Sequence, residues 1–327
     1  MTTEEVLKLL QASPAHISGE QISKTLNISR AAVWKAVKQL QQAGYEIEAA
    51  PRRGYRLAAM PDRLDAAKIA ACIPDHPWLP NLQIFGEIGS TNTCAKQLAA
   101  EGAPAGTVIL AERQTAGRGR LGRSFCSEPG GLYMSVILRP NEKPESLMHL
   151  TAAAAVAAMR AVEESCGVKA DIKWTNDLVV GRKKLCGILT ELSMDFDTRL
   201  VDAVIIGIGI NCNQAALDPA ISDMATTLRQ ETGAAVDRNL LAGNLICVFY
   251  ALSETLLRQK EDWLRRFRER CITPGQDVKL LRGDEVRYAH AEAIGPDAEL
   301  IVRFADGSTE SIASGEVSVR GMYGYTD

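Results

Sequence analysis

The chain has 327 residues, of which 46% are hydrophobic and 24% charged, and its formal net charge is −3. This ordinary globular composition excludes a collagen, a coiled coil and a mostly disordered chain. The length accommodates about two or three domains at roughly 100–200 residues each. The longest apolar runs, 152–159 and 203–210, are far shorter than the roughly 18 residues of a membrane span. The acidic start Met-Thr-Thr-Glu-Glu is unlike a secretory signal, so we expect a cytoplasmic protein without a membrane partner.

The first 60 residues carry eight Lys or Arg against five Asp or Glu, a net charge of +3. Ser or Thr followed three positions later by Glu or Gln predicts helix starts at Thr2 and Ser18. Ser29 is placed to cap a third helix that ends at Gly44. Alternating segments on both sides of a Pro-Arg-Arg-Gly turn then predict a hairpin. Three helices and a hairpin form a winged helix-turn-helix, which we expect over residues 1–60.

The third predicted helix carries a basic strip opposite its apolar face. In this fold the third helix docks in the major groove, while lysine and arginine on helix and hairpin neutralise phosphates. We therefore predict a DNA-binding surface made of Ser29, Arg30, Trp34, Lys35, Lys38, Arg52 and Arg53. The alternative is a protein-contact module whose basic face is only solvated.

The central segment, 61–272, alternates strand-like and helical patterns. Strands are predicted at 82–85, 107–112, 132–139, 171–174, 185–192 and 201–210, and helices at 92–101, 147–165 and 240–270. Several neighbouring strands have no helix between them. We therefore expect a mixed or antiparallel sheet in an α/β domain, rather than a doubly wound one.

The end of the chain changes character again. Residues 275–327 carry five basic and ten acidic side chains, and short strands are predicted at 278–281, 286–294, 299–304 and 317–320, with Asp306-Gly307 as a hairpin turn. We expect residues 273–327 to form a small SH3-like β-barrel. The whole chain is then an α+β protein of three domains, with boundaries after residues 60 and 272.

A loop in which glycine and arginine alternate follows the strand predicted at 107–112. Residues 117–124 read Gly-Arg-Gly-Arg-Leu-Gly-Arg-Ser, which fits the dinucleotide-binding pattern and, with arginine in place of lysine, the P-loop pattern. Both motifs need a helix directly afterwards, whereas a strand follows here. We therefore predict an anion-binding loop in which backbone N–H groups and the guanidinium groups of Arg118, Arg120 and Arg123 grip a carboxylate or phosphate. The alternative is a solvated basic turn.

Three further motifs are weak when taken singly. Lys173-Trp-Thr-Asn-Asp177 follows a strand and suits a nucleotide or metal-phosphate site, but Asn-Asp is also common in turns. Lys183-Lys184 opens a strand, so one lysine should point inward and need an anionic partner. Gly207-Ile-Gly209 lets another group approach the backbone closely. The eight cysteines lie at least 20 positions apart, so no zinc or dithiol motif is present in the sequence.

Taken in chain order, five motifs closely resemble the family of bifunctional biotin protein ligases that also repress the biotin operon. They are Ser90-Thr91-Asn92, the run Gln114 to Arg120, the run Lys173 to Asp177, the run Lys184 to Leu189, and the run Gly207 to Asn213. The resemblance implies that biotin and ATP, with Mg²⁺, form biotinyl-5′-AMP and pyrophosphate. Biotin is then transferred to a lysine of a carrier domain such as that of acetyl-CoA carboxylase. Operator DNA and a ligand-dependent homodimer are further implied.

The resemblance also implies roles for individual residues. Ser90, Thr91, Asn92 and Gln114 would contact the ureido head of biotin, and Arg118, Gly119 and Arg120 would belong to a loop that orders over the ligand. Lys184 would meet the biotin carboxylate and the adenylate phosphate, and Asn176 and Asp177 the nucleotide or its metal. Asn211 lies in the last motif and is assigned to the cofactor site. Lys184, Arg118 and Arg120 are therefore the expected catalytic residues, and the metal ligands stay unassigned.

The sequence departs from the family pattern in two places, and two alternative functions remain open. Thr175 stands where the family motif has proline, and residues 215–232, which would cover the adenine, carry no motif that we can assign. A lipoate ligase shares the adenylation chemistry, but the Gly-Arg-Gly-Arg loop argues against it. A ligand-sensing transcription factor that has lost catalysis is disfavoured by the retained Lys184 and arginine loop.

Overall fold

The computed structural model describes residues 2–42, 44–51, 53–59, 62–195, 197–214, 216–282, 285–313 and 316–319. They form two compact units, Met1–Asp62 and Arg63–Asp327. Within these described residues, no helix is long and apolar enough to cross a membrane.

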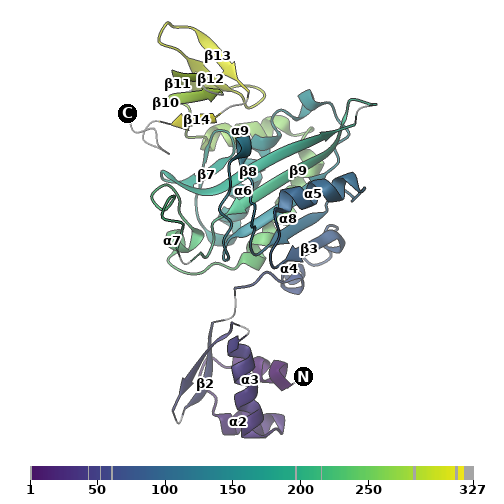
Figure 1. Ribbon diagram of the computed structural model, residues 1–327, viewed down its shortest axis with the longest axis vertical. Coiled ribbons are helices and arrows are strands. Elements are labelled where there is room, and N and C mark those ends of the chain that lie inside the picture. The colour runs from purple at the N-terminus through teal and green to yellow at the C-terminus, as the bar shows by residue number, and fades with distance from the viewer. Residues whose placement is uncertain are drawn as a thin grey trace. The chain divides into compact units, whose positions relative to one another are not determined.

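The first unit contains the three helices and the hairpin that the sequence predicts (Figure 1): α1 (Thr2–Gln11), α2 (Gly19–Leu26), α3 (Arg30–Gln42), and the antiparallel strands β1 (Glu46–Ala50) and β2 (Gly54–Ala59). The side chains of Ser18 and Ser29 accept hydrogen bonds from the backbone N–H groups of Gln21 and Ala32, so both predicted caps are confirmed. The hairpin is also bridged to the segment before α2, because Ile17 and Tyr55 exchange two backbone hydrogen bonds of 2.9 Å. That link was not predicted.

A seven-stranded sheet organises the second unit. Its strand order is β3-β4-β5-β9-β8-β7-β6, and the pair β3–β4 is parallel while the other neighbours are antiparallel. The predicted mixed sheet is therefore confirmed. The strands are β3 (Leu82–Phe85), β4 (Val108–Ala111), β5 (Leu132–Leu138), β6 (Asp171–Lys173), β7 (Asp177–Val180), β8 (Lys183–Met194) and β9 (Val201–Ile210).

The two faces of this sheet are covered differently (Figure 1). On one face, α6 (Leu150–Cys166), α8 (Arg238–Thr255) and α9 (Lys260–Arg270) bury the main core, with α4 (Ala66–Cys72) packed on α8. On the other face, α5 (Thr91–Ala100) packs on Ile137, Ala203 and Ile205. Because α5 covers only part of its face, the neighbouring part of β5, β8 and β9 is left for a site.

Some predicted elements differ from the structure. The single helix predicted at 240–270 was wrong: it is two helices, and the residues between α8 and α9 form a turn that lets Leu264 and Phe267 pack back into the core. Strand β7 and the short helices α4 and α7 (Leu228–Thr232) were missed. The start of α7 has a capping box of Thr227 and Gln230, a signal that is visible in the sequence.

The C-terminal strands form one five-stranded antiparallel sheet in the order β13-β12-β11-β10-β14. They are β10 (Asp277–Arg282), β11 (Glu285–Ile294), β12 (Leu300–Arg303), β13 (Thr309–Ile312) and β14 (Glu316–Val319). The turn at Asp306-Gly307 joins β12 to β13 as predicted. The closed barrel is not found, because β13 and β14 are the two open edges of the described sheet; the predicted strand end at Arg320 lies outside the described residues.

Candidate functional site

A cavity of about 610 Å³ lies beside α5, where β8 and β9 meet the loop that follows β4. Every residue that the sequence analysis assigned to a ligand or to catalysis lines it: Ser90, Thr91, Asn92, Gln114, Arg118, Gly119, Arg120, Asn176, Asp177, Lys184 and Asn211. Motifs that are weak singly are thus brought to one place by the sheet.

The start of α5 supplies a polar cluster to this cavity. The backbone N–H and the hydroxyl of Thr91 donate to Gln114 Oε1, over 2.8 and 3.1 Å. Gln114 Nε2 in turn donates to Ser127 Oγ over 2.8 Å, which fixes the orientation of its amide. Ser90, at 5% exposed, is the N-cap of α5. Ser127 was not among the predicted residues.

Asn92 connects α5 to the interior of the sheet. Its Oδ1 accepts from Ser135 Oγ at 2.6 Å, and its Nδ2 donates to Glu191 Oε2 at 2.9 Å. Lys96, one turn further along α5, donates to Glu191 Oε1 at 2.5 Å. Ser135 and Glu191 were also missed, because each lies inside a strand whose apolar pattern gives no sign of a polar contact.

Glycines on β8 and β9 form a wall of the cavity. A Cβ on Gly209 would lie 2.4 Å from the ring of Phe125, and a Cβ on Gly187, its partner in the strand register, would lie 3.1 Å from the same ring. A Cβ on Gly207 would lie 1.9 Å from Asn92 Oδ1. The close approach predicted for the β9 glycines is therefore confirmed, and its cause is the packing of Phe125 and Asn92.

Lys184 and Lys183 behave as the strand pattern predicts. Lys183 is exposed, whereas Lys184 is part-buried with its Nζ 2.7 Å from Asp177 Oδ1. Asp177 is the anionic partner that an inward lysine needs. The Nζ of Lys184 also lies 6.0 Å from the centre of the Phe125 ring.

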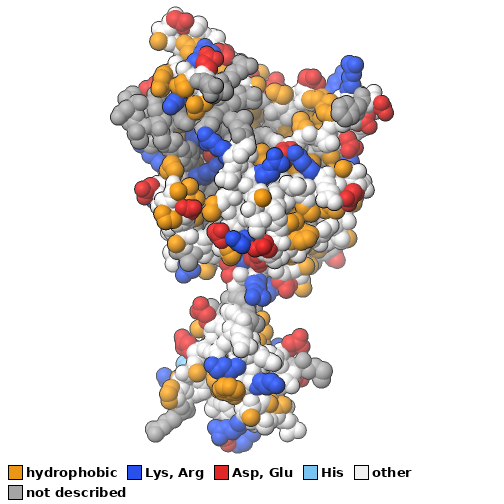
Figure 2. Space-filling model, in the orientation of Figure 1, with side chains coloured by type: hydrophobic (Ala, Val, Ile, Leu, Met, Phe, Trp, Pro, Cys, Tyr) orange, Lys and Arg blue, Asp and Glu red, His pale blue; other side chains and the backbone are white. Residues whose placement is uncertain are grey.

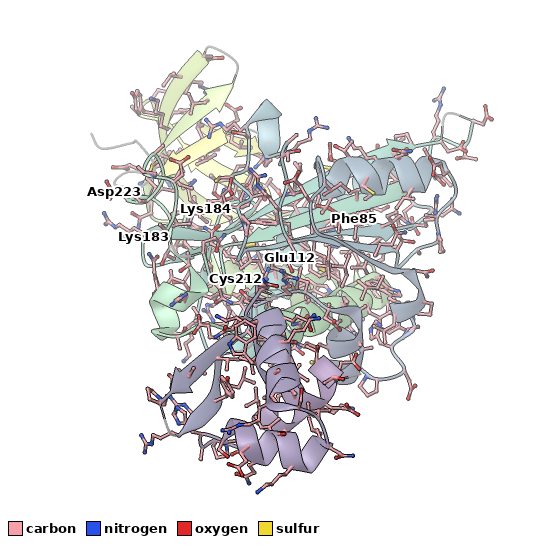
Figure 3. The ribbon with its side chains drawn as sticks, turned by 60° about the horizontal axis from the view of Figure 1, so that its bottom comes forward. Phe85, Glu112, Lys183, Lys184, Cys212 and Asp223 are labelled. Carbon is pink, nitrogen blue, oxygen red and sulfur yellow. The ribbon has the colours of Figure 1, made fainter. Side chains whose placement is uncertain are left out.

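Part of the segment 215–232, to which the sequence analysis could assign no motif, forms part of the cavity wall. Lys184 N donates to Met224 O and Thr226 N donates to Lys184 O, so this segment, which includes Asp223, runs beside the start of β8 (Figure 3). Asp218, Ala220, Ile221, Met224 and Ala225 face the cavity. Ala215 lies outside the described residues.

The arginine loop is a compact turn. Gly119 N donates to Arg123 O at 2.7 Å, Phe125 N donates to Gly117 O at 2.9 Å, and Arg120–Gly122 form one short 3-10 turn. The absence of a long helix after the loop, on which the anion-binding interpretation depends, is thus confirmed. Arg120 donates to Asn176 Oδ1 at 3.1 Å, which joins the loop to the β6–β7 turn.

The same β6–β7 turn is tied to the C-terminal sheet. Lys173 Nζ donates to Val317 O at 3.1 Å, and Trp174 Nε1 donates to Ala298 O at 2.8 Å. Lys173 and Val317 both line the cavity. The Trp174–Thr175 peptide bond is cis. Lys173 and Trp174 therefore hold the two sheets together, while Asn176 and Asp177 face the cavity.

The predicted DNA-binding residues lie on the exposed surface of the first unit. Arg30, Lys35 and Lys38 on α3 are exposed, and Trp34 is 57% exposed among them. Figure 2 shows Lys and Arg side chains beside a hydrophobic one on this unit. Ser29 caps α3, Arg53 is exposed, and Arg52 lies outside the described residues.

No group of three or more His, Cys, Asp or Glu side chains suited to a metal ion exists in the described part of the chain. Two carboxylates, those of Asp177 and Asp218, line the cavity. Mg²⁺ keeps several water ligands and binds through one or two carboxylates plus substrate phosphates, so these two side chains are the candidates for holding it.

Comparisons with known proteins agree with this arrangement. Residues 85–211 match the Biotin/lipoate A/B protein ligase family, and residues 2–56 match an HTH domain. The "Bifunctional ligase/repressor BirA" of Bacillus subtilis is 41% identical over 242 residues, 73% of this chain and 74% of that protein. The protein of the same name from Salmonella typhimurium is 30% identical over 317 residues, 96% of both chains.

A solved structure shares much of the fold of this chain. The "Biotin protein ligase from Aquifex aeolicus in complex with biotin and ATP" is 31% identical, with a TM-score of 0.63. The match covers 73% of this chain and 98% of that one.

Proposed function

Because the chain belongs to the Biotin/lipoate A/B protein ligase family, we propose that its cavity binds biotin and ATP and joins them. The protein is a biotin protein ligase with an N-terminal helix-turn-helix repressor domain.

The main support for this proposal is the arrangement of polar and cationic groups along β8. Lys184 lies at the start of the strand and Leu189 five residues later, about 16 Å at roughly 3.3 Å per residue. The hydrogen-bonded cluster of Thr91, Gln114 and Asn92 lies at the Leu189 end. The ureido head of biotin suits the polar end and its carboxylate suits the lysine, with Phe125 and the glycines beside the apolar part between them.

Adenylation brings two anions together. A carboxylate oxygen of biotin forms a bond to the α-phosphorus of ATP, and the bond from that phosphorus to pyrophosphate breaks. Positive charge placed where charge develops lowers the barrier, and we assign this to Lys184, Arg118 and Arg120. In the second step a lysine amine of the carrier attacks the activated carbonyl carbon and AMP leaves. Positioning supplies most of the rate, so a histidine base is not needed.

Mg²⁺ would reach the site with ATP. It would neutralise charge on the phosphates, and Asp177, which pairs with Lys184, is a carboxylate at the proposed cationic end of the cavity. Asn176 would then bind the nucleotide, and the segment 218–225 would cover its base. Asn211 donates to Thr226 O at 3.1 Å, so it holds that segment in place.

The first unit is proposed to bind operator DNA through Arg30, Trp34, Lys35, Lys38 and the hairpin turn. Two half-sites separated by one helical turn would need a homodimer. We further propose three domains, 1–60, 61–272 and 273–327, with the last sheet SH3-like, and activity in the cytoplasm. The proposed carrier is the biotin carrier domain of acetyl-CoA carboxylase.

Exchange of labelled pyrophosphate into ATP tests the proposal and separates its alternatives. Biotin should support exchange, and lipoate should not. Exchange with lipoate in preference to biotin would identify a lipoate ligase, and no exchange with either ligand would leave a transcription factor without catalysis.

A further inference from the structure

Trp34 is the one tryptophan of this chain that lies open to solvent. The chain has four tryptophans, and all of them are among the described residues. Trp34 is 57% exposed, whereas Trp78, Trp174 and Trp263 are 7%, 3% and 5% exposed. Tryptophan contributes most where its large ring is covered, in a core or at an interface. The core of the first unit does not cover Trp34, so we looked for a partner that would.

The indole of Trp34 lies within the basic strip of α3. Arg30 and Lys38 stand one turn before and one turn after it, so the three side chains share one exposed face of the helix. The helix contains no Asp or Glu. Its opposite face packs into the core of the first unit through Val33, Ala36, Val37 and Leu40. The positive charge around the indole favours a partner that carries phosphates.

The cations and the indole can recognise different parts of a DNA duplex. Lysine and arginine neutralise phosphates, which positions a protein on DNA but carries no sequence information. An indole offers a flat apolar surface and one N–H donor, with no acceptor. In a helix-turn-helix the N-terminal residues of the third helix contact base edges, and Trp34 lies in the first half of α3. Trp34 is therefore placed to contact a base.

Thymine has the base edge that matches an indole best. In the major groove it presents an acceptor, O4, beside an apolar C5-methyl group. Cytosine presents an amino donor there, which would face the indole N–H, and adenine and guanine present no methyl group. We propose that Trp34 packs on a thymine methyl group and so determines a base preference of the operator half-site. This inference rests on the proposed function, because it assumes that the first unit binds DNA.

Replacing thymine with uracil removes only the methyl group and tests the proposal on the unaltered protein. The full-length protein, with biotin and ATP present, first selects a duplex from a randomised pool. Each thymine of that duplex is then replaced in turn. We expect a position in each half-site at which the Kd rises about fourfold, the scale of one buried methyl-sized group. Unchanged affinity at every position would overturn the proposal while DNA binding stands, whereas a protein that binds no duplex would remove the proposed DNA-binding function instead.

Trp34→Ala identifies the residue that makes the contact. Because the indole is exposed, its removal leaves the core intact, which thermal unfolding checks. DNA affinity should fall, and uracil at the sensitive position should cause no further loss, because the methyl group no longer has a partner. Lys38→Ala is the matched control: its affinity should fall, but the fourfold ratio should remain. A fourfold ratio that persists in Trp34→Ala would overturn the proposal.

Acrylamide quenching of fluorescence reports on the same contact. The other three tryptophans are buried, so the readily quenched emission of the full-length protein comes from Trp34. The selected duplex at saturation should cover the indole and lower the quenching constant. Phosphate contacts made by the lysines alone would leave the indole accessible. An unchanged quenching constant in the saturated complex would therefore contradict the proposal.

Discussion

Lys184 Nζ lies 2.7 Å from Asp177 Oδ1, on neighbouring strands of the sheet. The ion pair joins two motifs, each of which is weak when taken singly. It holds the lysine at the end of the cavity opposite the polar cluster, where a carboxylate and a phosphate would meet.

Replacing Lys184 with Ala should slow adenylation. The lysine is assigned to charge that develops in the transition state, and the loss of one such contact commonly costs about 2.7–4 kcal/mol, or 10²–10³ in rate. Rapid-quench measurement of single-turnover biotinyl-AMP formation checks this. Lys183→Ala is the matched control, because Lys183 is the exposed neighbour on the same strand. A normal rate in Lys184→Ala would remove Lys184 from the mechanism.

Gly209→Ala should weaken biotin binding without a change at Lys184. Its Cβ would lie 2.4 Å from the Phe125 ring, so the ring and its loop must move. Overpacking of this kind typically costs about 1–3 kcal/mol. Isothermal titration with biotin is the measurement. Gly86→Ala, whose Cβ would meet no atom within 4 Å, should behave as the wild type. Equal affinities in the two variants would show that Phe125 does not limit the cavity.

The sequence predicts those parts of the protein that local signals determine. Ser18 and Ser29 start helices, and the Gly-Arg loop is visible because glycine and arginine alternate without a helix after them. Ser135 and Glu191 could not be predicted, because their contacts with Asn92 depend on the register of β5, β9 and β8. The segment 218–225 reaches the cavity by pairing with the start of β8, and no local pattern shows that pairing.

Lowering the pH should destabilise the second unit before its carboxylates titrate. Burial lowers the pKa of His76 and is the main cause that lowers the pKa of His149. In the unfolded chain both histidines titrate at about pH 6.5. As the pH drops below that value, the unfolded state binds more protons than the folded state, so the free energy of unfolding decreases. Urea unfolding from pH 7.5 to 5.5 should therefore show a falling free energy of unfolding.

His76→Phe isolates one of the two contributions. The imidazole packs edge-on against Trp78 and Tyr250, which a phenyl ring can also contact. The variant should lose less stability between pH 7.5 and 5.5 than the wild type does. An unchanged slope would mean that His76 does not titrate differently in the two states.

Lys38→Ala should weaken operator binding and make it less dependent on salt. Each phosphate contact contributes about 0.9 to the slope of log affinity against log salt concentration, so the slope should fall by about one unit. Fluorescence anisotropy at several salt concentrations checks this. Lys24→Ala on α2, whose lysine pairs with Glu20, is the control of equal charge. If the salt dependence of DNA affinity were the same in both variants, Lys38 would not contact a DNA phosphate, and the DNA would bind at another surface of this unit.

The most direct test of the central claim is the mass of a purified biotin carrier domain after incubation with this protein. The account predicts one biotin adduct, on a lysine, that requires both biotin and ATP and forms far more slowly with Lys184→Ala. A carrier domain that stays unmodified, or one that gains lipoate in preference to biotin, would contradict it.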